Sequence, residues 1–376
     1  MKKSASKSTL AVHAGTRGDT LYGGRVTPVY PAAAYDYEQE VRYPRYFNTP
    51  NLMAVAAKMA ALENGEGALV FSTGMAAIMT SLFAMVKTGD HVVLQQDLYG
   101  GTHHAVVNEF HRFGILYTLV DASDPKNFEK AITKNTRVIY IETPSNPLLK
   151  ITDIAAVARI ASQHKLVSMI DNTFASPVNQ NPIDLGIDVV LHSGTKYIGG
   201  HGDLMCGVAV SSKEIISQIK GSAMHFGGTP DAHTCSLIER SLKTIVVRVK
   251  QQNENAMTLA KFLSSDSRIH RVYYPGLKSH PGHAIAKKQM TGGFGGMVSF
   301  EVKKNPDRFL DKLKIIQRAV SLGGVDSTIC SSVRTSHAKL TPAERKKAGI
   351  SDNLLRFSVG IEDAEDLIKD IQQALL

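Results

Sequence analysis

The sequence predicts an α/β fold with a mostly parallel sheet, an irregular N-terminal arm and a smaller C-terminal α+β domain. Short runs rich in Val and Ile alternate with amphipathic segments of helix length, which is typical of strands joined by crossover helices. The 376 residues are 43% hydrophobic and 20% charged, so they can bury a large core shared by two parts of the chain. We expect the arm over 1–51, a large α/β domain over 52–235 and the C-terminal domain over 236–376.

The predicted elements follow this order along the chain. The arm is rich in proline and contains the pair Gly23-Gly24, so it is too extended to be a compact unit of its own. The expected strands of the large domain are Ala68–Phe71, His91–Leu94, Arg137–Ile141, Leu166–Ile170 and Val189–Leu191, and its expected helices are Met75–Val86, Pro125–Thr133 and Ile154–His164. The expected C-terminal elements are a long helical stretch over Leu237–Leu263, a strand over Met297–Val302 and a final helix over Ala364–Leu376.

Composition excludes several classes of protein. No run of eighteen apolar residues occurs and Met1–Ser8 is polar and basic, so we expect no membrane span, no secretion signal and a cytoplasmic location. Cys206, Cys235 and Cys330 are odd in number and far apart, which favours reduced thiols over a disulfide framework or a metal site. The net charge of +9 comes from scattered basic residues, which favours a solvated surface over a nucleic-acid partner.

One lysine stands where an α/β fold binds its ligand. Ser193-Gly194-Thr195-Lys196-Tyr197 directly follows the strand Val189–Leu191, at the carboxyl end of a parallel sheet. A partly desolvated lysine amine there can condense with an aldehyde cofactor, and the hydroxyls of Ser193 and Thr195 can hold a phosphate close by. Taken alone the motif is weak, because most lysines are simply solvated.

Two neighbouring motifs strengthen this interpretation. Asp171 ends the run Leu166–Ile170 and would lie at the same sheet edge, where it can pair with a pyridinium nitrogen or merely cap a strand. Ser72-Thr73-Gly74-Met75-Ala76 lies between a strand and a helix, where free backbone N–H groups bind an anion, although a turn of small residues is equally consistent with it. The sequence therefore favours a cofactor site at this edge of the sheet.

These motifs belong to a longer ordered set. The chain resembles the Cys/Met-metabolism pyridoxal 5'-phosphate (PLP) enzymes, also called the cystathionine γ-synthase family, over almost its whole length. The further segments that carry the resemblance are Leu10–Gly15, Thr27–Tyr30, Asp97–Thr102, Glu142–Pro147, Asn253–Ala256 and Leu355–Glu362. The resemblance implies the PLP-dependent aminotransferase-like fold (fold type I) and a small amino-acid substrate.

The resemblance also implies a role for each site residue. Lys196 carries PLP and moves protons, Asp171 pairs with the pyridine nitrogen, and Tyr99 stacks on the ring and assists the leaving group. The backbone of Gly74 and Met75 and the hydroxyls of Ser193 and Thr195 bind the cofactor phosphate. Asn146 contacts the phenolic oxygen of the cofactor or the substrate carboxylate, and Arg356 binds that carboxylate through two hydrogen bonds.

The arm is expected to contact a second subunit. In the family a Tyr-x-Arg pair completes the neighbouring subunit's phosphate site, and Tyr43-Pro44-Arg45 occupies the matching place here. Self-association as a dimer or a dimer of dimers follows from this resemblance. The family usually continues to Asn-Pro-Thr, whereas this chain has Asn48-Thr49-Pro50-Asn51, which indicates a one-residue shift in the following loop.

Substrate choice is open to several alternatives. The resemblance places Asp326 and Ser327 among the substrate contacts, and an acid at position 326 is similar to the cystathionine γ-synthase and γ-lyase branch. Gly101 stands where methionine γ-lyases commonly have a cysteine. We therefore expect γ-elimination or γ-replacement on cystathionine-type amino acids, with a cystathionine β-lyase or another carbon-sulfur lyase as the alternative. A PLP-binding regulatory protein without turnover is a different class, which would not need both Lys196 and Arg356.

Overall fold

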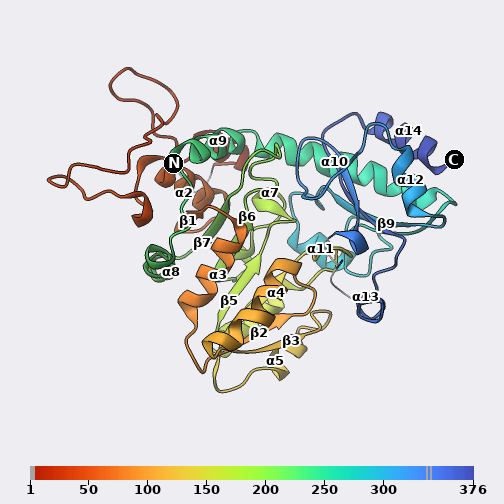
Figure 1. The fold of residues 1–376 in the computed structure, drawn as a ribbon, viewed down its shortest axis with the longest axis horizontal. Coiled ribbons are helices and arrows are strands. Elements are labelled where there is room, and N and C mark those ends of the chain that lie inside the picture. Colours follow the sequence, from red (N-terminus) through yellow and green to blue (C-terminus); the bar gives the residue numbers. More distant parts are fainter. Residues whose placement is uncertain (1–4, 336–337, 339–340) are drawn as a thin grey trace.

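Two sheets organise the chain. The computed structural model describes residues 5–335, 338 and 341–376. Figure 1 shows the two sheet regions side by side, with the long helix α10 running from the large region along the smaller one. The larger sheet has the order β1-β7-β6-β5-β4-β2-β3, and all its strands are parallel except β7. Its strands are β1 Gly67–Phe71, β2 His91–Gln95, β3 Leu116–Val120, β4 Thr136–Glu142, β5 Val167–Asp171, β6 Val189–Ser193 and β7 Gly207–Ser211. The predicted α/β class is confirmed.

The larger sheet is buried on both faces. Val92 and Leu94 of β2 pack in one apolar cluster, whereas Val93 between them packs in another on the opposite face. Such continuous apolar strands are expected where helices cover both sides of a parallel sheet. The helical elements of this region are α2 Pro50–Leu62, α3 Gly74–Met85, α4 Gly100–Glu109, η2 Phe110–Phe113, α5 Lys126–Lys130, α6 Ile154–Gln163, α7 Ser176–Asn179, η3 Pro182–Leu185 and α8 Lys213–Phe226.

The smaller sheet has five strands in the order β10-β11-β12-β9-β8. Its strands are β8 Ile269–Tyr273, β9 Met297–Val302, β10 Gln317–Arg318, β11 Thr328–Ser331 and β12 Leu354–Ser358. The helical elements after α8 are α9 Ala232–Leu242, which packs against α2 of the large-sheet region, and then α10 Ile245–Ser265, α11 His283–Gln289, α12 Pro306–Lys312, η4 Ser332–Arg334, α13 Pro342–Ala348 and α14 Ala364–Leu375. β9 coincides with the predicted strand, and α14 ends one residue before the predicted helix.

The long helix predicted over Leu237–Leu263 is interrupted. α9 ends at Leu242 and α10 begins at Ile245, so the chain turns at Lys243 and Thr244. The buried side chain of Arg248 donates to the carbonyl oxygen of Ser241 at 2.9 Å, and its Nη1 donates to the carbonyl oxygen of Tyr197 at 2.9 Å. Because carbonyls at a helix end need partners, this buried arginine stabilises the break.

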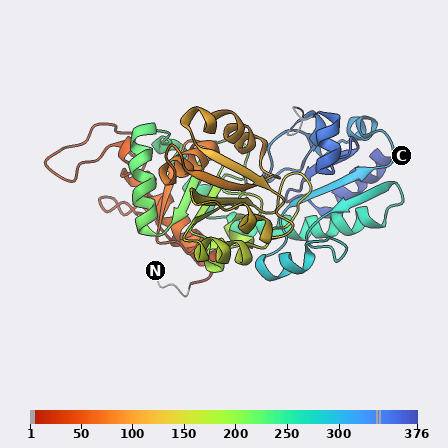
Figure 2. The same ribbon diagram turned by 90° about the horizontal axis from the view of Figure 1, so that it is seen from below.

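The N-terminal arm is more ordered than predicted. It contains helix α1, Lys7–His13, and the short helix η1, Pro44–Tyr46. Lys58 of α2 is fully buried and its Nζ donates to the carbonyl oxygens of Ala11 and Val12, so it satisfies the end of α1. Figures 1 and 2 both show the segment between these helices extending away from the rest of the chain.

Residues 1–4 of the arm lie outside the described residues. The domain boundaries after residues 51 and 235 stay a prediction. Among the helices of residues 5–335, 338 and 341–376, none is both long enough and apolar enough to span a membrane.

Candidate active site

A cavity of about 520 Å³ lies at the carboxyl ends of the parallel strands. Strands β1, β2, β4, β5 and β6 each lead into one of its walls, as expected for ligand sites in α/β folds. The predicted residues that line it are Gly74, Met75, Tyr99, Asn146, Asp171, Ser193, Thr195, Lys196 and Arg356. The structure therefore brings nine residues from six separate segments of the sequence into one site.

Lys196 lies in a turn directly after β6. Its N–H donates to the carbonyl oxygen of Ser193 at 3.2 Å, and its Nζ donates to Ser321 Oγ at 2.9 Å. Burial lowers the pKa of the Lys196 amine, the positive charge of Arg356 lowers it further, and the negative charge of Asp171 partly opposes both. A lowered pKa increases the fraction of free amine, which is the form that attacks a carbonyl group.

Two buried carboxyl groups lie side by side at the sheet edge. Asp171 and Glu142 are register partners at the ends of β5 and β4. Burial raises the pKa of Asp171, although the N–H of Thr173 donates to its Oδ1 at 3.0 Å. Burial and the negative charge of Asp171 raise the pKa of Glu142 well above its ordinary range. Among the described residues neither carboxyl group forms an ion pair, so Asp171 is suited to a cationic partner supplied by a ligand.

The start of α3 has features that suit an anion. Thr73 caps this twelve-residue helix, its Oγ1 accepting from the N–H of Ala76 at 3.0 Å. A Cβ atom on Gly74 would lie 2.8 Å from Cβ of Ser193, so only glycine allows the two turns to approach this closely. The backbone N–H groups at the start of α3 and the hydroxyls of Ser193 and Thr195 therefore line the same cavity, as an anion site requires.

Arg356 of β12 is fixed before any substrate arrives. Its Nη1 donates to Asn146 Oδ1 at 3.0 Å, and its Nη2 donates to the carbonyl oxygen of Ser321 at 3.1 Å. The residue is buried and faces the same cavity as Lys196. A guanidinium held in this way can bind a carboxylate through two parallel hydrogen bonds.

Tyr99 follows β2 and stands at the start of α4. Its N–H donates to Glu142 Oε2 at 2.6 Å, and the residue is 46% exposed. A Cβ atom on Gly101 would lie 2.4 Å from Cε1 of the Tyr99 ring. The absence of a side chain at Gly101 therefore provides the space that the Tyr99 ring occupies.

Four predicted residues do not line this cavity. The hydroxyl of Ser327 donates to Glu362 Oε2 at 2.9 Å and accepts from the N–H of Gly360, and Asp326 beside it is exposed. Arg45 donates to the carbonyl oxygen of Met224 at 2.6 Å and Tyr43 is 41% exposed. Their roles in substrate binding and in a neighbouring subunit stay predictions.

Glu142 and Ser321 are among the cavity residues that the sequence did not predict as site residues. Glu142 ends a predicted strand and begins the motif Glu142–Pro147, which could have indicated it. Ser321 has no such motif of its own, yet it contacts Lys196 and has a φ of 73°. A serine in this left-handed region is uncommon and is often found at functional sites.

The residues of the cavity fit PLP. The lysine amine suits the aldehyde, the buried carboxyl group of Asp171 suits the ring nitrogen, and the start of α3 suits the phosphate. Each of these groups reaches the cavity from a different strand of the sheet.

Comparison with known proteins agrees with this fit. Residues 8–376 match the family described as Cys/Met metabolism PLP-dependent enzyme. The chain is 43% identical to cystathionine gamma-lyase of Bacillus subtilis (strain 168), over 98% of this chain and 99% of that protein. It is 40% identical to cystathionine beta-lyase of Coxiella burnetii (strain RSA 493 / Nine Mile phase I), over 99% and 98%. The crystal structure of cystathionine gamma synthase from Xanthomonas oryzae pv. oryzae in complex with cystathionine superposes with a TM-score of 0.95 at 37% identity, over 99% and 98%. The chain therefore belongs to the Cys/Met-metabolism PLP-dependent enzymes.

Proposed function

We propose that this enzyme makes or cleaves the carbon-sulfur bond of cystathionine-type amino acids by γ-elimination or γ-replacement. The observation that carries the proposal is that a lysine of lowered pKa, a buried carboxyl group and a fixed arginine face one cavity. PLP bound there supplies the electron sink that stabilises negative charge on the substrate α-carbon. The substrate is thus an α-amino acid, and the similarity to cystathionine gamma-lyase and gamma synthase supports a leaving group on its side chain.

Each residue of the cavity has a definite task in this chemistry. Arg356 binds the substrate carboxylate, which fixes the α-carbon relative to Lys196. The amine of Lys196 removes the α-proton and then a β-proton, and the hydroxyl of Tyr99 delivers a proton to the leaving sulfur. In elimination, cystathionine and water yield cysteine, 2-oxobutanoate and ammonia. In replacement, an activated homoserine ester and cysteine yield cystathionine and the free acid.

A β-lyase reaction is the second candidate, and the 40% identity to a cystathionine beta-lyase favours it. Elimination at the β-carbon needs only the first proton removal, so the same residues suffice. Methionine γ-lyase chemistry is a further alternative, since the chain is also 40% identical to an L-methionine gamma-lyase of Fusobacterium nucleatum subsp. polymorphum, although Gly101 stands where such enzymes commonly have a cysteine.

We further propose that the enzyme works as a homotetramer in the cytoplasm. The partly exposed pair Tyr43 and Arg45 supports a subunit contact, since it does not line the cavity of its own chain. All three cysteines are free and buried, which suits a reducing compartment. Light scattering of the purified protein measures the number of subunits directly.

Product analysis tests the reaction type. The enzyme is incubated separately with L-cystathionine and with O-succinyl-homoserine plus cysteine, and the 2-oxo acids and amino acids are identified. Cysteine with 2-oxobutanoate, or newly formed cystathionine, supports γ chemistry. Homocysteine with pyruvate selects the β-lyase, and the absence of every product contradicts both.

A further inference from the structure

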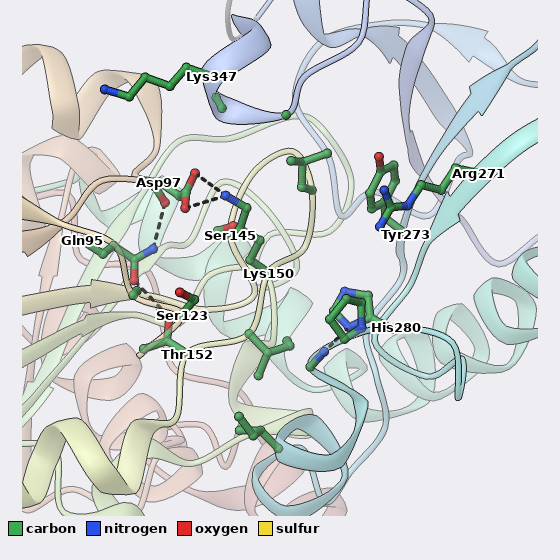
Figure 3. Close-up of a pocket in the computed structure, with 18 residues that line it drawn as sticks. Gln95, Asp97, Ser123, Ser145, Lys150, Thr152, Arg271, Tyr273, His280 and Lys347 are labelled. Atoms are coloured by element: carbon green, nitrogen blue, oxygen red, sulfur yellow. Dashed lines mark hydrogen bonds and ion pairs between the residues drawn. The ribbon is translucent and has the colours of Figure 1, made fainter. Parts of the chain in front are cut away.

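A second cavity of about 500 Å³ lies between the two sheet regions. One wall comes from the loops after β2, β3 and β4, and the other comes from β8, α11 and α13 (Figure 3). Its size falls in the range of cavities that bind small molecules. None of the residues assigned above to PLP or to the substrate lines it.

The lining of this cavity is positively charged. Three basic residues, Lys150, Arg271 and Lys347, line it together with a single acidic residue, Asp97, which is already paired with Lys150 at 3.0 Å. Burial lowers the pKa of His280 to about 4, so this histidine is uncharged at neutral pH. An excess of positive charge therefore remains, which favours an anionic ligand.

Arg271 is the group best placed to bind that anion. Its guanidinium carbon lies 4.9 Å from the centroid of the Tyr273 ring, which restricts its orientation. Figure 3 shows its side chain directed across the cavity toward the wall that bears Lys150. In the described part of the chain Arg271 forms no ion pair with a carboxylate, whereas the neighbouring Glu301 accepts from the hydroxyl of Tyr273 at 2.6 Å. The planar guanidinium is thus available to bind an oxyanion through two parallel hydrogen bonds.

The rest of the lining limits the body of the ligand. Leu148, Ile151 and Ile285 give the cavity an apolar surface between its two charged walls. We propose that this cavity binds a small organic anion whose carboxylate or phosphate contacts Arg271 and whose apolar body covers these side chains. The inference does not depend on the reaction that the enzyme catalyses.

The two cavities are neighbours, so a test must separate them. The amide of Gln95, which lines the second cavity, donates to the carbonyl oxygens of Asp97 at 2.8 Å and of Glu142 at 2.7 Å. Glu142 lines the PLP cavity, so these hydrogen bonds connect the two cavities. The PLP-loaded enzyme is titrated by calorimetry with phenyl phosphate, phenylacetate and the uncharged benzyl alcohol. Binding of phenyl phosphate or of phenylacetate identifies which oxyanion is preferred, and benzyl alcohol is expected not to bind.

The matched variants decide where the anion binds. Arg271→Gln should weaken binding by roughly tenfold or more, since it removes a charged bidentate contact. Ser123→Glu, which adds a carboxylate to the exposed part of the lining, should also weaken it. Arg159→Gln removes an exposed charge from α6, outside the lining, and should leave the dissociation constant unchanged.

Three results would overturn the proposal. They are the absence of binding by either anion, an unchanged dissociation constant in Arg271→Gln, and loss of binding in Arg356→Gln. The last result would place the anion in the PLP cavity instead. Turnover without added anion should be the same in Arg271→Gln as in the wild type, which shows that the variant is folded.

Discussion

Arg356 offers a test in which geometry and charge can be separated. Its guanidinium has two contacts in the structure, to Asn146 Oδ1 at 3.0 Å and to the carbonyl oxygen of Ser321 at 3.1 Å. Arg356→Lys keeps the positive charge and loses the planar fork, whereas Arg356→Gln loses both. The pair of variants therefore measures the two contributions one at a time.

The expected magnitudes follow from the number of hydrogen bonds. A hydrogen bond to a charged group contributes about 1.5–3 kcal/mol, so losing one of two bonds to the substrate carboxylate in Arg356→Lys lowers kcat/KM by roughly tenfold to a hundredfold. Losing both in Arg356→Gln lowers it by about 10² to 10⁴. Because the substrate carboxylate is bound throughout the reaction, most of the loss in Arg356→Lys should lie in KM.

The pH dependence gives a second readout. Burial and then the positive charge of Arg356 lower the pKa of Lys196. Arg356→Gln removes the charge, so the pKa of Lys196 rises and a higher pH is needed to obtain the free amine. The acid limb of the kcat profile should therefore move to higher pH in Arg356→Gln and stay in place in Arg356→Lys.

Steady-state kinetics with L-cystathionine across this pH range makes both measurements. An unchanged KM in Arg356→Lys would refute the carboxylate clamp. An unchanged acid limb in Arg356→Gln would refute the electrostatic link between the two residues.

Three further predictions concern the phosphate site, the buried acid and the arm. Gly74→Ala should weaken PLP binding, measured by titration of the PLP-free enzyme, because its Cβ would lie 2.8 Å from Cβ of Ser193, while Gly221→Ala, where the space is open, should not. Glu142→Gln should retain turnover and Glu142→Leu should lose it. The N–H of Tyr99 donates to Glu142 Oε2 at 2.6 Å, and only glutamine keeps an acceptor for this hydrogen bond. Burial lowers the pKa of Lys58 from 10.5 to about 8 in the folded chain. Between these two pH values the unfolded chain binds a proton that the folded chain lacks, so the free energy of unfolding should rise with pH across this range. Denaturant titrations should show this rise in the wild type and not in Lys58→Met, and an equal rise in both would contradict it.

The parallel core of the fold could be predicted because its strands are continuous apolar runs. All five expected strands of the large sheet are present, but β3 and β7 were missed. β3, Leu116–Val120, is an edge strand with no fully buried residue, so it lacks the apolar run of a central strand. β7, Gly207–Ser211, lies antiparallel to its neighbours and follows β6 without a helix between them, so it lacks the strand-helix alternation on which the prediction rested.

The site could be predicted where motifs mark strand ends. Lys196 and Asp171 follow apolar runs, and their meeting is a consequence of parallel strands sharing one edge. Ser321 could not be found in this way, because its position depends on packing of the C-terminal half against the large sheet. The break between α9 and α10 was missed for the same reason, since it depends on the distant carbonyl of Tyr197.

The most direct test of the account is to locate the lysine that carries PLP. The PLP-loaded enzyme is reduced with borohydride, which makes the lysine linkage permanent, and the modified peptide is identified by mass spectrometry. We predict that the added mass lies on Lys196 and that Lys196→Ala gives no labelled peptide. A label on another lysine, or a label that persists in Lys196→Ala, would contradict the central claim.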